Sequence, residues 1–460
     1  MKNKKIYFIG IGGIGMSALA QYFMQNQYDV FGYDLTPSPI TEMLIQKGAN
    51  IHYQPDVNSI PNDIDFVVYT PAIHSEFSEF QYFIQKNIPM FKRSQVLGMI
   101  TDEFFTIAVA GTHGKTTTTS MTSHLFHKGT DTFLAFIGGI SKNLNDNYCY
   151  DIIKDYAHKI AVVEADEFDR SFLTLHPNIA IITSMDADHL DIYENETKLY
   201  DAFQQFANQS ENLIIEENVS KFIAKKNKYI YGFSKSCDCY PYNIRHGENF
   251  TKFDLHTPFV ELNNLKTTLR GDYNILNTVA SIFAFILEKR ITSNTNLDSI
   301  DLDIQEVVSQ KTFSFLGVKR RFEYIVKNDD FVFIDDYAHH PQEMSSFFSA
   351  VRQLYPDKKI TGIFQPHLFS RTRDFADEFA RALELLNKVI LLPIYPAREA
   401  PIEGINSEFL LKKVNVEDKI FLQKDELIKY LRENKSEILL TVGAGDIDRL
   451  VPIIAQNVVC

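Results

Sequence analysis

A short loop between an apolar run and a helix-forming run constrains the fold of this chain more than any other segment. The loop follows the apolar residues 106–110, and it consists of Gly111, Thr112, His113, Gly114, Lys115, Thr116 and Thr117. In a strand, loop and helix of this kind the backbone N–H groups surround phosphate oxygens, because the helix N-terminus carries unpaired donors. Lys115 would neutralise the β and γ phosphates, and the Thr116 hydroxyl would bind Mg²⁺. The loop therefore predicts an α/β domain that binds a nucleotide.

One residue departs from the strict phosphate-loop pattern, which has a glycine where this chain has Val109. A threonine-rich helix start without a ligand is the alternative interpretation. We favour nucleotide binding because the loop stands between a strand and a helix.

Charge and composition exclude several classes of partner. Lys and Arg number 46 against 59 Asp and Glu in 460 residues, and the net charge of −13 disfavours nucleic acid as the main partner. The four cysteines are too scattered for a disulfide framework, which favours the reducing cytoplasm. No apolar run approaches the roughly 18 to 20 residues that cross a bilayer. We expect a soluble protein with no membrane insertion, either a monomer or a homodimer.

A second glycine loop follows the first apolar run of the chain, and its glycines are Gly10, Gly12, Gly13 and Gly15. The G-x-G-x-x-G pattern lets the backbone approach a diphosphate closely. On this motif alone two interpretations stay open: NAD, with Asp34 holding a ribose hydroxyl, and a merely structural turn. The basic start and the apolar stretch up to Ala20 are also similar to a signal peptide. Four glycines in six positions fit a phosphate-binding turn better.

Short apolar runs alternate with helical patterns along the chain, which is typical of βαβ units around parallel sheets. They group into three domains, at 1–103, 104–313 and 314–460. Apolar and polar residues alternate loosely over 237–266, and we interpret this segment as antiparallel β structure outside the parallel sheets. The other expected strands are 6–9, 29–33, 66–69, 106–110, 160–163, 179–183, 331–334, 360–364, 389–392 and 438–442.

Acidic residues follow two neighbouring strands of the predicted central sheet. Glu164 ends one strand, and residues 186–191, with His189 among them, follow the next. Because the carboxyl ends of strands in an open sheet carry ligand groups, we expect Glu164 to complete the metal site of the loop. His189 could bind a cation or position a substrate, and a purely structural histidine is the alternative. The acidic neighbours of Glu164 are interpreted mostly as a solvated turn, and these are Asp166, Glu167 and Asp169.

Polar and basic residues mark further element ends. Asn274 and Asn277 open a helix predicted over 277–287, where their amides suit the edge of a base, although helix capping is an equal alternative. Arg320 and Arg321 are either a phosphate clamp or a solvated linker. Four strand ends of the third domain carry His, Arg, Asp and Gly, a set that packing alone does not explain: 335–341, 364–373, 393–398 and 443–446.

Taken together and in this order, the motifs resemble the Mur ligase family of peptidoglycan synthesis. They span nearly the whole chain, and they are specific jointly, whereas the first glycine loop alone is not. The segments that carry the resemblance are G-I-G-G-I-G-M-S at 10–17, A-G-T-H-G-K-T-T-T-T at 110–119, V-E-A-D-E at 163–167, D-A-D-H-L-D at 186–191, D-D-Y-A-H-H-P at 335–341, F-Q-P-H at 364–367, S-R-T-R at 370–373 and V-G-A-G-D-I at 442–447.

The resemblance implies a three-domain α/β protein. Its N-terminal domain would be Rossmann-like and bind a UDP-sugar, its central domain a P-loop ATPase-like mixed sheet, and its C-terminal domain again Rossmann-like. The first glycine loop, with Met16, Ser17 and Asp34, would then bind the UDP-sugar rather than NAD.

The resemblance also implies roles for single residues. The Mg²⁺ ligands would be Thr116, Glu164 and His189. The ATP-binding residues would be the loop 111–117 with Asn274, Asn277, Arg321 and Asp336. The amino-acid substrate would contact Tyr337, His339, His367, Arg371 and Arg373. The catalytic residues would be Lys115, Glu164, His189, Arg321 and His367.

Two positions depart from the family pattern. Tyr273 stands where the family often has the His of H-N-x-x-N, and Leu368 stands where it has an Arg after F-Q-P-H. The second departure removes a cation near the expected alanine carboxylate. That contact is left to Arg371 or Arg373.

The implied activity is ATP-dependent amide formation. The lactyl carboxylate of UDP-N-acetylmuramate would attack the γ phosphorus of ATP, and the amine of L-alanine would displace phosphate from the resulting acyl phosphate. A sister ligase that attaches a recycled peptide to the same sugar is one alternative. A nucleotide-dependent binding protein is another, and a nicotinamide dehydrogenase a third.

Overall fold

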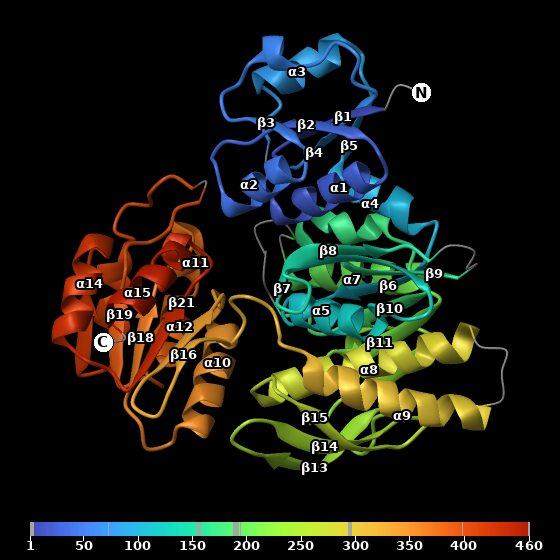
Figure 1. Ribbon diagram of the computed structural model, residues 1–460. Coiled ribbons are helices and arrows are strands. Elements are labelled where there is room, and N and C mark those ends of the chain that lie inside the picture. The colour runs from blue at the N-terminus through green and yellow to red at the C-terminus, as the bar shows by residue number, and fades with distance from the viewer. Residues whose placement is uncertain are drawn as a thin grey trace. The chain divides into compact units, whose positions relative to one another are not determined.

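The computed structural model describes residues 4–71, 73–153, 158–186, 193, 195–292, 297–397 and 399–458, without the side chains of 297–302. Three sheets dominated by parallel strands, each with helices, confirm the predicted α/β class (Figure 1). The chain forms two compact units, of which one contains Met1–Arg245, Lys252–Thr267 and Leu276–Leu316, and the other contains His246–Thr251, Thr268–Ile275 and Gly317–Cys460.

The first sheet has five parallel strands in the order β3-β2-β1-β4-β5. This is the doubly wound order, whose direction reverses between β1 and β4, so a ligand is expected beyond the carboxyl end of β1. The strands are β1 (Lys5–Ile9), β2 (Asp29–Tyr33), β3 (Asn50–His52), β4 (Phe66–Tyr69) and β5 (Met90–Lys92). The helices are α1 (Ile14–Gln25), α2 (Pro39–Gln46), α3 (Ser78–Gln85) and α4 (Arg93–Thr101).

The second sheet has seven strands in the order β12-β11-β10-β6-β9-β7-β8, and only β8 is antiparallel to its neighbour. Its central strands are fully buried apolar runs, as parallel strands covered on both faces should be. The strands are β6 (Phe105–Ala110), β7 (Thr132–Ser141), β8 (Asp146–Asp151), β9 (Lys159–Glu164), β10 (Ile179–Ile182), β11 (Asn212–Glu216) and β12 (Lys228–Tyr231). The associated helices are α5 (Lys115–Phe126) and α7 (Glu196–Gln209), with short turns η2 (Phe168–Thr174) and η3 (Ser220–Phe222).

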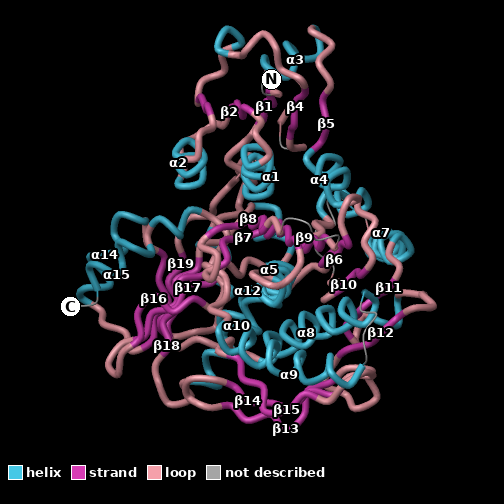
Figure 2. Tube along the Cα trace, turned by 45° about the vertical axis from the view of Figure 1, so that its right-hand side comes forward, coloured by secondary structure: helices cyan, strands magenta, loops and turns pink. Residues whose placement is uncertain are grey.

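The loosely alternating segment forms a small sheet of its own, in the order β13-β14-β15. Its strands are β13 (Tyr240–His246), β14 (Thr251–His256) and β15 (Leu262–Thr267). The next two helices, α8 (Asp272–Thr292) and α9 (Leu297–Ser314), lie side by side in both views (Figures 1 and 2). Helix α8 begins five residues before the predicted start, directly after Gly271, whose φ of +85° lies outside the helical region. Asn277 therefore lies inside α8 and Asn274 in its first turn, so the capping alternative is wrong.

The third sheet has six strands in the order β16-β17-β21-β18-β19-β20, with β16 antiparallel to β17. The strands are β16 (Glu323–Lys327), β17 (Val332–Asp336), β18 (Ile360–Phe364), β19 (Lys388–Leu391), β20 (Asp418–Phe421) and β21 (Ile438–Val442). The helices are α10 (Pro341–Leu354), α11 (Phe369–Asp374), α12 (Ala376–Leu383), α13 (Ser407–Lys413), α14 (Lys424–Glu433) and α15 (Val451–Val458). Separate apolar clusters cover the two faces of this sheet.

One hydrophobic cluster extends from the first sheet into the second, and helix α1 lies within it. The Tyr22 ring lies 6.1 Å from that of Phe136 on β7. The fully buried Asn147 amide donates to Ser17 Oγ at 3.2 Å, and Gln21 Nε2 donates to Asp146 Oδ1 at 2.9 Å. This packing fixes the first glycine loop relative to the second sheet, and it gives the site one continuous support.

None of the described helices has both the length and the apolar character that crossing a membrane requires. The domain boundaries after residues 103 and 313 stay predictions.

Candidate functional site

The predicted phosphate-binding loop joins β6 to α5. Gly111 has φ +136° and Gly114 has φ +80°, values that side chains other than glycine rarely adopt. A Cβ on Gly114 would lie 2.7 Å from Asn277 Oδ1, and one on Gly111 would lie 2.9 Å from the backbone nitrogen of Ser184. Backbone conformation and close neighbours both require these glycines.

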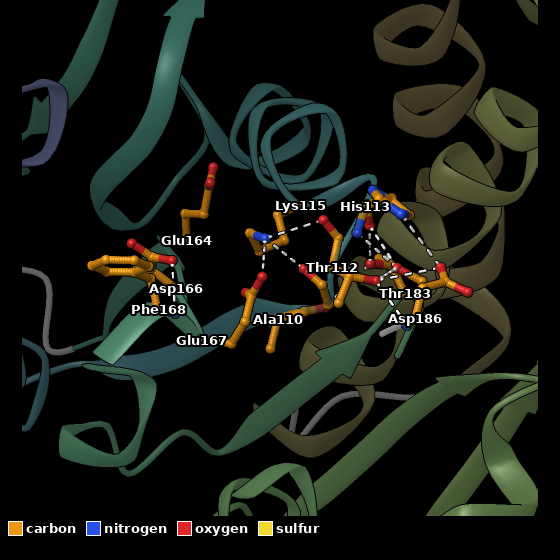
Figure 3. Close-up of polar contacts among 12 residues, drawn as sticks. Ala110, Thr112, His113, Lys115, Glu164, Asp166, Glu167, Phe168, Thr183 and Asp186 are labelled. Atoms are coloured by element: carbon orange, nitrogen blue, oxygen red, sulfur yellow. Dashed lines mark hydrogen bonds and ion pairs between the residues drawn. The ribbon is translucent and has the colours of Figure 1, made fainter. Parts of the chain in front are cut away.

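The side chain of Lys115 lies against the loop and is held by a carboxylate (Figure 3). Its Nζ donates to the carbonyl oxygen of Gly111 at 2.6 Å and to Glu167 Oε1 at 2.9 Å. Burial opposes the charge of the ammonium, but the carboxylates of Glu167, Asp166 and Glu164 outweigh it and raise the pKa of Lys115. Lys115 therefore carries a fixed positive charge at neutral pH.

The interpretation of the acidic run as a solvated turn is wrong for Glu167, whose side chain is 1% exposed. The Tyr193 hydroxyl donates to the carbonyl oxygen of Glu167 and closes this turn further. Asp169, by contrast, is 38% exposed and pairs with Lys92 at 3.2 Å. Glu167 is buried because each charge of the pair compensates the lost hydration of the other. Sequence reasoning missed this residue because nothing but its distance from Glu164 distinguishes it from its acidic neighbours.

Thr116 and Glu164 bring oxygen atoms together where the loop would bind a metal. The Thr116 hydroxyl donates to Glu164 Oε1 at 3.2 Å, and the N–H of Gly138 donates to Glu164 Oε2 at 3.0 Å. Burial raises the pKa of the Glu164 carboxyl, although Lys115 opposes the shift. A hydroxyl and a carboxylate are oxygen ligands of the kind that Mg²⁺ takes, so the residues fit the ion. The third predicted ligand, His189, lies outside the described residues.

The end of β10 braces the loop from the other side. The N–H of His113 donates to Ser184 Oγ at 2.7 Å, and the N–H of Asp186 donates to Thr112 Oγ1 at 3.0 Å. The Asp186 carboxylate lies 3.4 Å from His113 Nε2 (Figure 3). Sequence reasoning missed Ser184, whose only signal is its position two residues after a strand that neighbours β6.

The first glycine loop turns directly after β1. The N–H of Gly12 donates to Asp34 Oδ2 at 2.7 Å, so Asp34 holds the loop itself. A cavity of about 250 Å³ lies beside the loop. One wall contains Gly13, Gly15 and Met16 at the N-terminus of α1, and the other contains Glu164 and Asp166. The cavity thus reaches from the first glycine loop to Glu164, whose carboxylate accepts from Thr116 of the second loop. Ser17 does not line it, because its hydroxyl donates to the carbonyl oxygen of Ile14 inside the packed core.

Arg93 lines the same cavity and was not singled out from the sequence. It is the first residue of α4, and its guanidinium lies 3.7 Å from Asp166 Oδ2. A Cβ on Gly15 would lie 2.9 Å from its Nη1, so the guanidinium lies over the glycine loop. A cation in this position suits a diphosphate, and a lone arginine at a helix start gives no pattern that predicts it.

The two predicted asparagines have different surroundings. Asn277 Oδ1 accepts from the Thr118 hydroxyl at 3.2 Å and lies beside Gly114, so it packs against the phosphate-binding loop. Asn274 Nδ2 donates to the carbonyl oxygen of Arg270 at 2.7 Å.

A second polar cluster occupies the end of β17. Asp336 accepts from the N–H groups of Phe322 and Ala338 at 2.7 and 2.8 Å. Burial raises the pKa of Asp336 to about 6, although Arg321 opposes the shift. The Arg321 guanidinium lies 5.1 Å over the Tyr337 ring. Arg321 also lies 3.6 Å from Glu343 Oε1, so it packs against this cluster and is not part of a solvated linker.

The end of β18 adds His367 to this cluster. The His367 ring lies 6.0 Å from that of His339 and stacks on Tyr395 at 5.7 Å. Burial and the Arg371 guanidinium lower the pKa of His367 to about 4, so its imidazole is neutral at pH 7. Arg371 is 9% exposed, whereas Arg373 points to solvent and pairs with the adjacent Asp374 at 2.7 Å. Of the two predicted arginines, Arg371 is therefore buried near His367, whereas Arg373 lies at the surface and outside this cluster.

Three family models that match successive parts of the chain all belong to one family. Residues 5–105 match the model described as Mur ligase family, catalytic domain, residues 109–285 match the Mur ligase middle domain, and residues 320–445 match the Mur ligase, glutamate ligase domain. The UDP-N-acetylmuramate–L-alanine ligase of Christiangramia forsetii is 44% identical, with 96% of this chain and 95% of that protein covered. The enzyme of the same name from Flavobacterium johnsoniae is 43% identical, with 98% and 97% covered.

Two solved structures extend the comparison. The crystal structure of UDP-N-acetylmuramate–alanine ligase from Thermotoga maritima has a TM-score of 0.78 and 27% identity, with 99% of this chain and 98% of that chain covered. A murein peptide ligase from Psychrobacter arcticus has a TM-score of 0.69 at 19% identity, with both chains covered completely, and this likeness shows the fold alone.

We predict that Glu167→Gln destabilises the protein through Lys115. Removing one partner leaves a buried ammonium without its nearest counter-charge, and we expect the free energy of unfolding to fall by about 3 kcal/mol. Urea unfolding followed by circular dichroism measures this. Asp169→Asn is the matched control, because it removes an exposed pair worth less than about 1 kcal/mol. Equal effects of the two variants would contradict the buried pair.

We predict a pH-dependent contribution of His367 to stability. Its folded pKa of about 4 lies below the ordinary 6.5, so the unfolded chain takes up the proton first. Stability is therefore complete above pH 6.5 and is lost as pH falls toward 4. Between pH 7.5 and 5 the native protein should lose about 2 kcal/mol more than His367→Gln. If both unfold with the same pH dependence, His367 is not a buried neutral imidazole.

Proposed function

The chain belongs to the Mur ligase family, and on that premise we propose that it joins L-alanine to the lactyl carboxylate of UDP-N-acetylmuramate in peptidoglycan precursor synthesis. ATP drives the reaction and is converted to ADP and phosphate. Relatives that carry this activity as their name match nearly their whole length at 43–44% identity, which supports the substrate pair. The structural observation that carries the proposal is the cavity that runs from the first glycine loop to Glu164, the hydrogen-bond partner of Thr116 in the second loop.

The cavity explains how two anionic substrates can meet. The N-terminus of α1, together with Arg93, faces the diphosphate of the UDP-sugar, because helix N-terminal donors and an arginine both favour phosphate. The loop at Gly111–Thr117 holds the triphosphate of ATP. The lactyl carboxylate then reaches the γ phosphate across the cavity beside Glu164.

The main obstacle is charge, because a carboxylate must approach a polyphosphate. Lys115 supplies a fixed positive charge that is most useful when negative charge redistributes in the transition state. Thr116 and Glu164 would hold Mg²⁺, with His189 as a further ligand, and the ion would neutralise phosphate oxygens.

The reaction proceeds in two displacements. A carboxylate oxygen bonds to the γ phosphorus, the bond to the β-phosphate oxygen breaks, and ADP leaves. The neutral amine of L-alanine then attacks the acyl carbon and forms a tetrahedral intermediate, which expels inorganic phosphate and loses a proton. No covalent enzyme nucleophile takes part.

The cluster at the ends of β17 and β18 serves the nucleotide and the amino acid. We assign Asp336 and Asn274 to the adenosine part of ATP, and Arg321 to the γ phosphate. Arg371 is assigned to the alanine carboxylate in preference to Arg373, because it is buried beside His367. Within the described part of the chain no group hydrogen-bonds the buried His367 Nδ1, which supports a substrate contact there.

The proposal extends to domains and compartment. We propose a UDP-sugar domain at 1–103, an ATP domain at 104–313 and a C-terminal domain at 314–460, and the spans of the three family models support these boundaries. We place the protein in the cytoplasm, where ATP and the nucleotide sugar are available. Both substrates are small molecules.

We predict that phosphate release requires both UDP-N-acetylmuramate and L-alanine, and that Lys115→Ala lowers kcat/KM by at least about 100-fold, because the transition state loses its principal cation. Lys358→Ala, at an exposed lysine in the turn before β18, is the control and should retain activity. Phosphate release by a coupled assay and product mass by mass spectrometry provide the readouts.

A competition between L-alanine and a cell-wall tripeptide distinguishes this enzyme from the sister ligase. Preference for the tripeptide would assign the chain to that activity instead. Nucleotide binding without any amide product would overturn the ligase proposal, as would unchanged turnover in Lys115→Ala.

A further inference from the structure

Three potential metal ligands meet at the end of α5 opposite the phosphate-binding loop. They are His127, Cys149 and Asp151, and their ligand atoms all lie within 4.8 Å of one another. Asp151 Oδ2 lies 2.8 Å from His127 Nδ1, and Cys149 Sγ lies 3.3 Å from the same nitrogen. The proposed reaction uses none of these side chains.

The fold brings the three residues together by simple means. Cys149 and Asp151 are two residues apart on β8, so their side chains project from the same face of the strand. His127 directly follows the last residue of α5. The N–H of Lys128 donates to Asp151 Oδ2 at 3.1 Å and fixes the carboxylate beside the imidazole.

The pattern of contacts differs from that of a catalytic relay. A nucleophile, base and acid relay uses both ring nitrogens of the histidine, one toward each partner. Here the thiol and the carboxylate both face Nδ1. One nitrogen carries at most one proton, so it cannot donate to the carboxylate and accept from the thiol at the same time.

We propose that His127 Nδ1, Cys149 Sγ and an Asp151 carboxylate oxygen bind one divalent cation of the Zn²⁺ class. A shared cation would replace the protons between these groups and bind all three converging atoms at once. Nitrogen, sulfur and oxygen together are a donor set that suits Zn²⁺ and does not suit Mg²⁺. Three protein ligands leave one tetrahedral position for water.

The surroundings agree with a cation site. The C-terminal end of α5 carries the negative end of the helix dipole, which favours a positive ion. The His127 side chain is 17% exposed and that of Asp151 is 30% exposed, so an ion can enter from solvent. The ammonium of Lys311 lies nearby, but it donates to the backbone carbonyl oxygen of His127 at 2.7 Å and not to the imidazole ring. Helix α5 has 12 residues, a rise of about 18 Å, so this site is separate from the Mg²⁺ position at Thr116.

Cobalt spectroscopy tests the proposal on the full-length protein. The chain has four cysteines, and a thiolate bound to Co²⁺ gives a charge-transfer band that oxygen ligands cannot give. After treatment with a chelator and addition of excess Mg²⁺, Co²⁺ should produce this band with one equivalent bound, and Zn²⁺ should remove it. A variant with Cys237→Ser, Cys239→Ser and Cys460→Ser should keep the band. Cys149→Ser should lose it.

Two further observations keep the test decisive. His127→Gln retains the thiol and should weaken Co²⁺ binding by at least about 10-fold, which covers the case in which Cys149→Ser folds poorly. Circular dichroism establishes the fold of each variant. The absence of a thiolate band in the native protein would overturn the proposal, as would a band that persists in folded Cys149→Ser.

Discussion

The register between β6 and its two parallel neighbours determines where the polar groups of the site lie. Glu164 at the end of β9 pairs with Val109, and Ile182 at the end of β10 pairs with Ala110. Three strand ends therefore meet beside the loop at Gly111–Thr117, although they are far apart in sequence. A slip of one residue would turn Glu164 to the opposite face of the sheet and remove the partner of Thr116. The buried apolar strands below the site maintain this register.

Local pairing of charges explains how an acidic chain can bind phosphates. Lys115 is fixed by Glu167, and Arg93 lies beside Asp166. Each cation is held in place by a carboxylate, so positive groups stand beside both glycine loops in spite of the net charge of −13. The same pairing keeps these side chains from moving freely before substrate arrives, which lowers the entropy that binding must remove. The first glycine loop contributes backbone donors in place of charge.

Much of the fold could be predicted from the sequence, because buried parallel strands are continuous apolar runs and the two glycine loops each follow one. The predicted start of α8 is five residues too late, because the first turn of the helix is polar and the helical spacing of apolar residues begins only after it. The burial of Glu167 and the role of Arg93 could not be predicted, because both depend on contacts between segments distant in sequence. Arg371 and Arg373 have the same chemistry in the sequence, and only the geometry of α11 distinguishes the buried one from the exposed one.

We propose that the first glycine loop holds the UDP-sugar at the cavity and that the second loop holds ATP beside Glu164, at the far wall of that cavity. A crystal structure with UDP-N-acetylmuramate and a nonhydrolysable ATP analogue tests it most directly. We expect the triphosphate at Gly111–Thr117, the sugar diphosphate at the N-terminus of α1, and a lactyl oxygen about 3 to 3.5 Å from the γ phosphorus. A nucleotide bound elsewhere, or a sugar outside the cavity, would contradict the account.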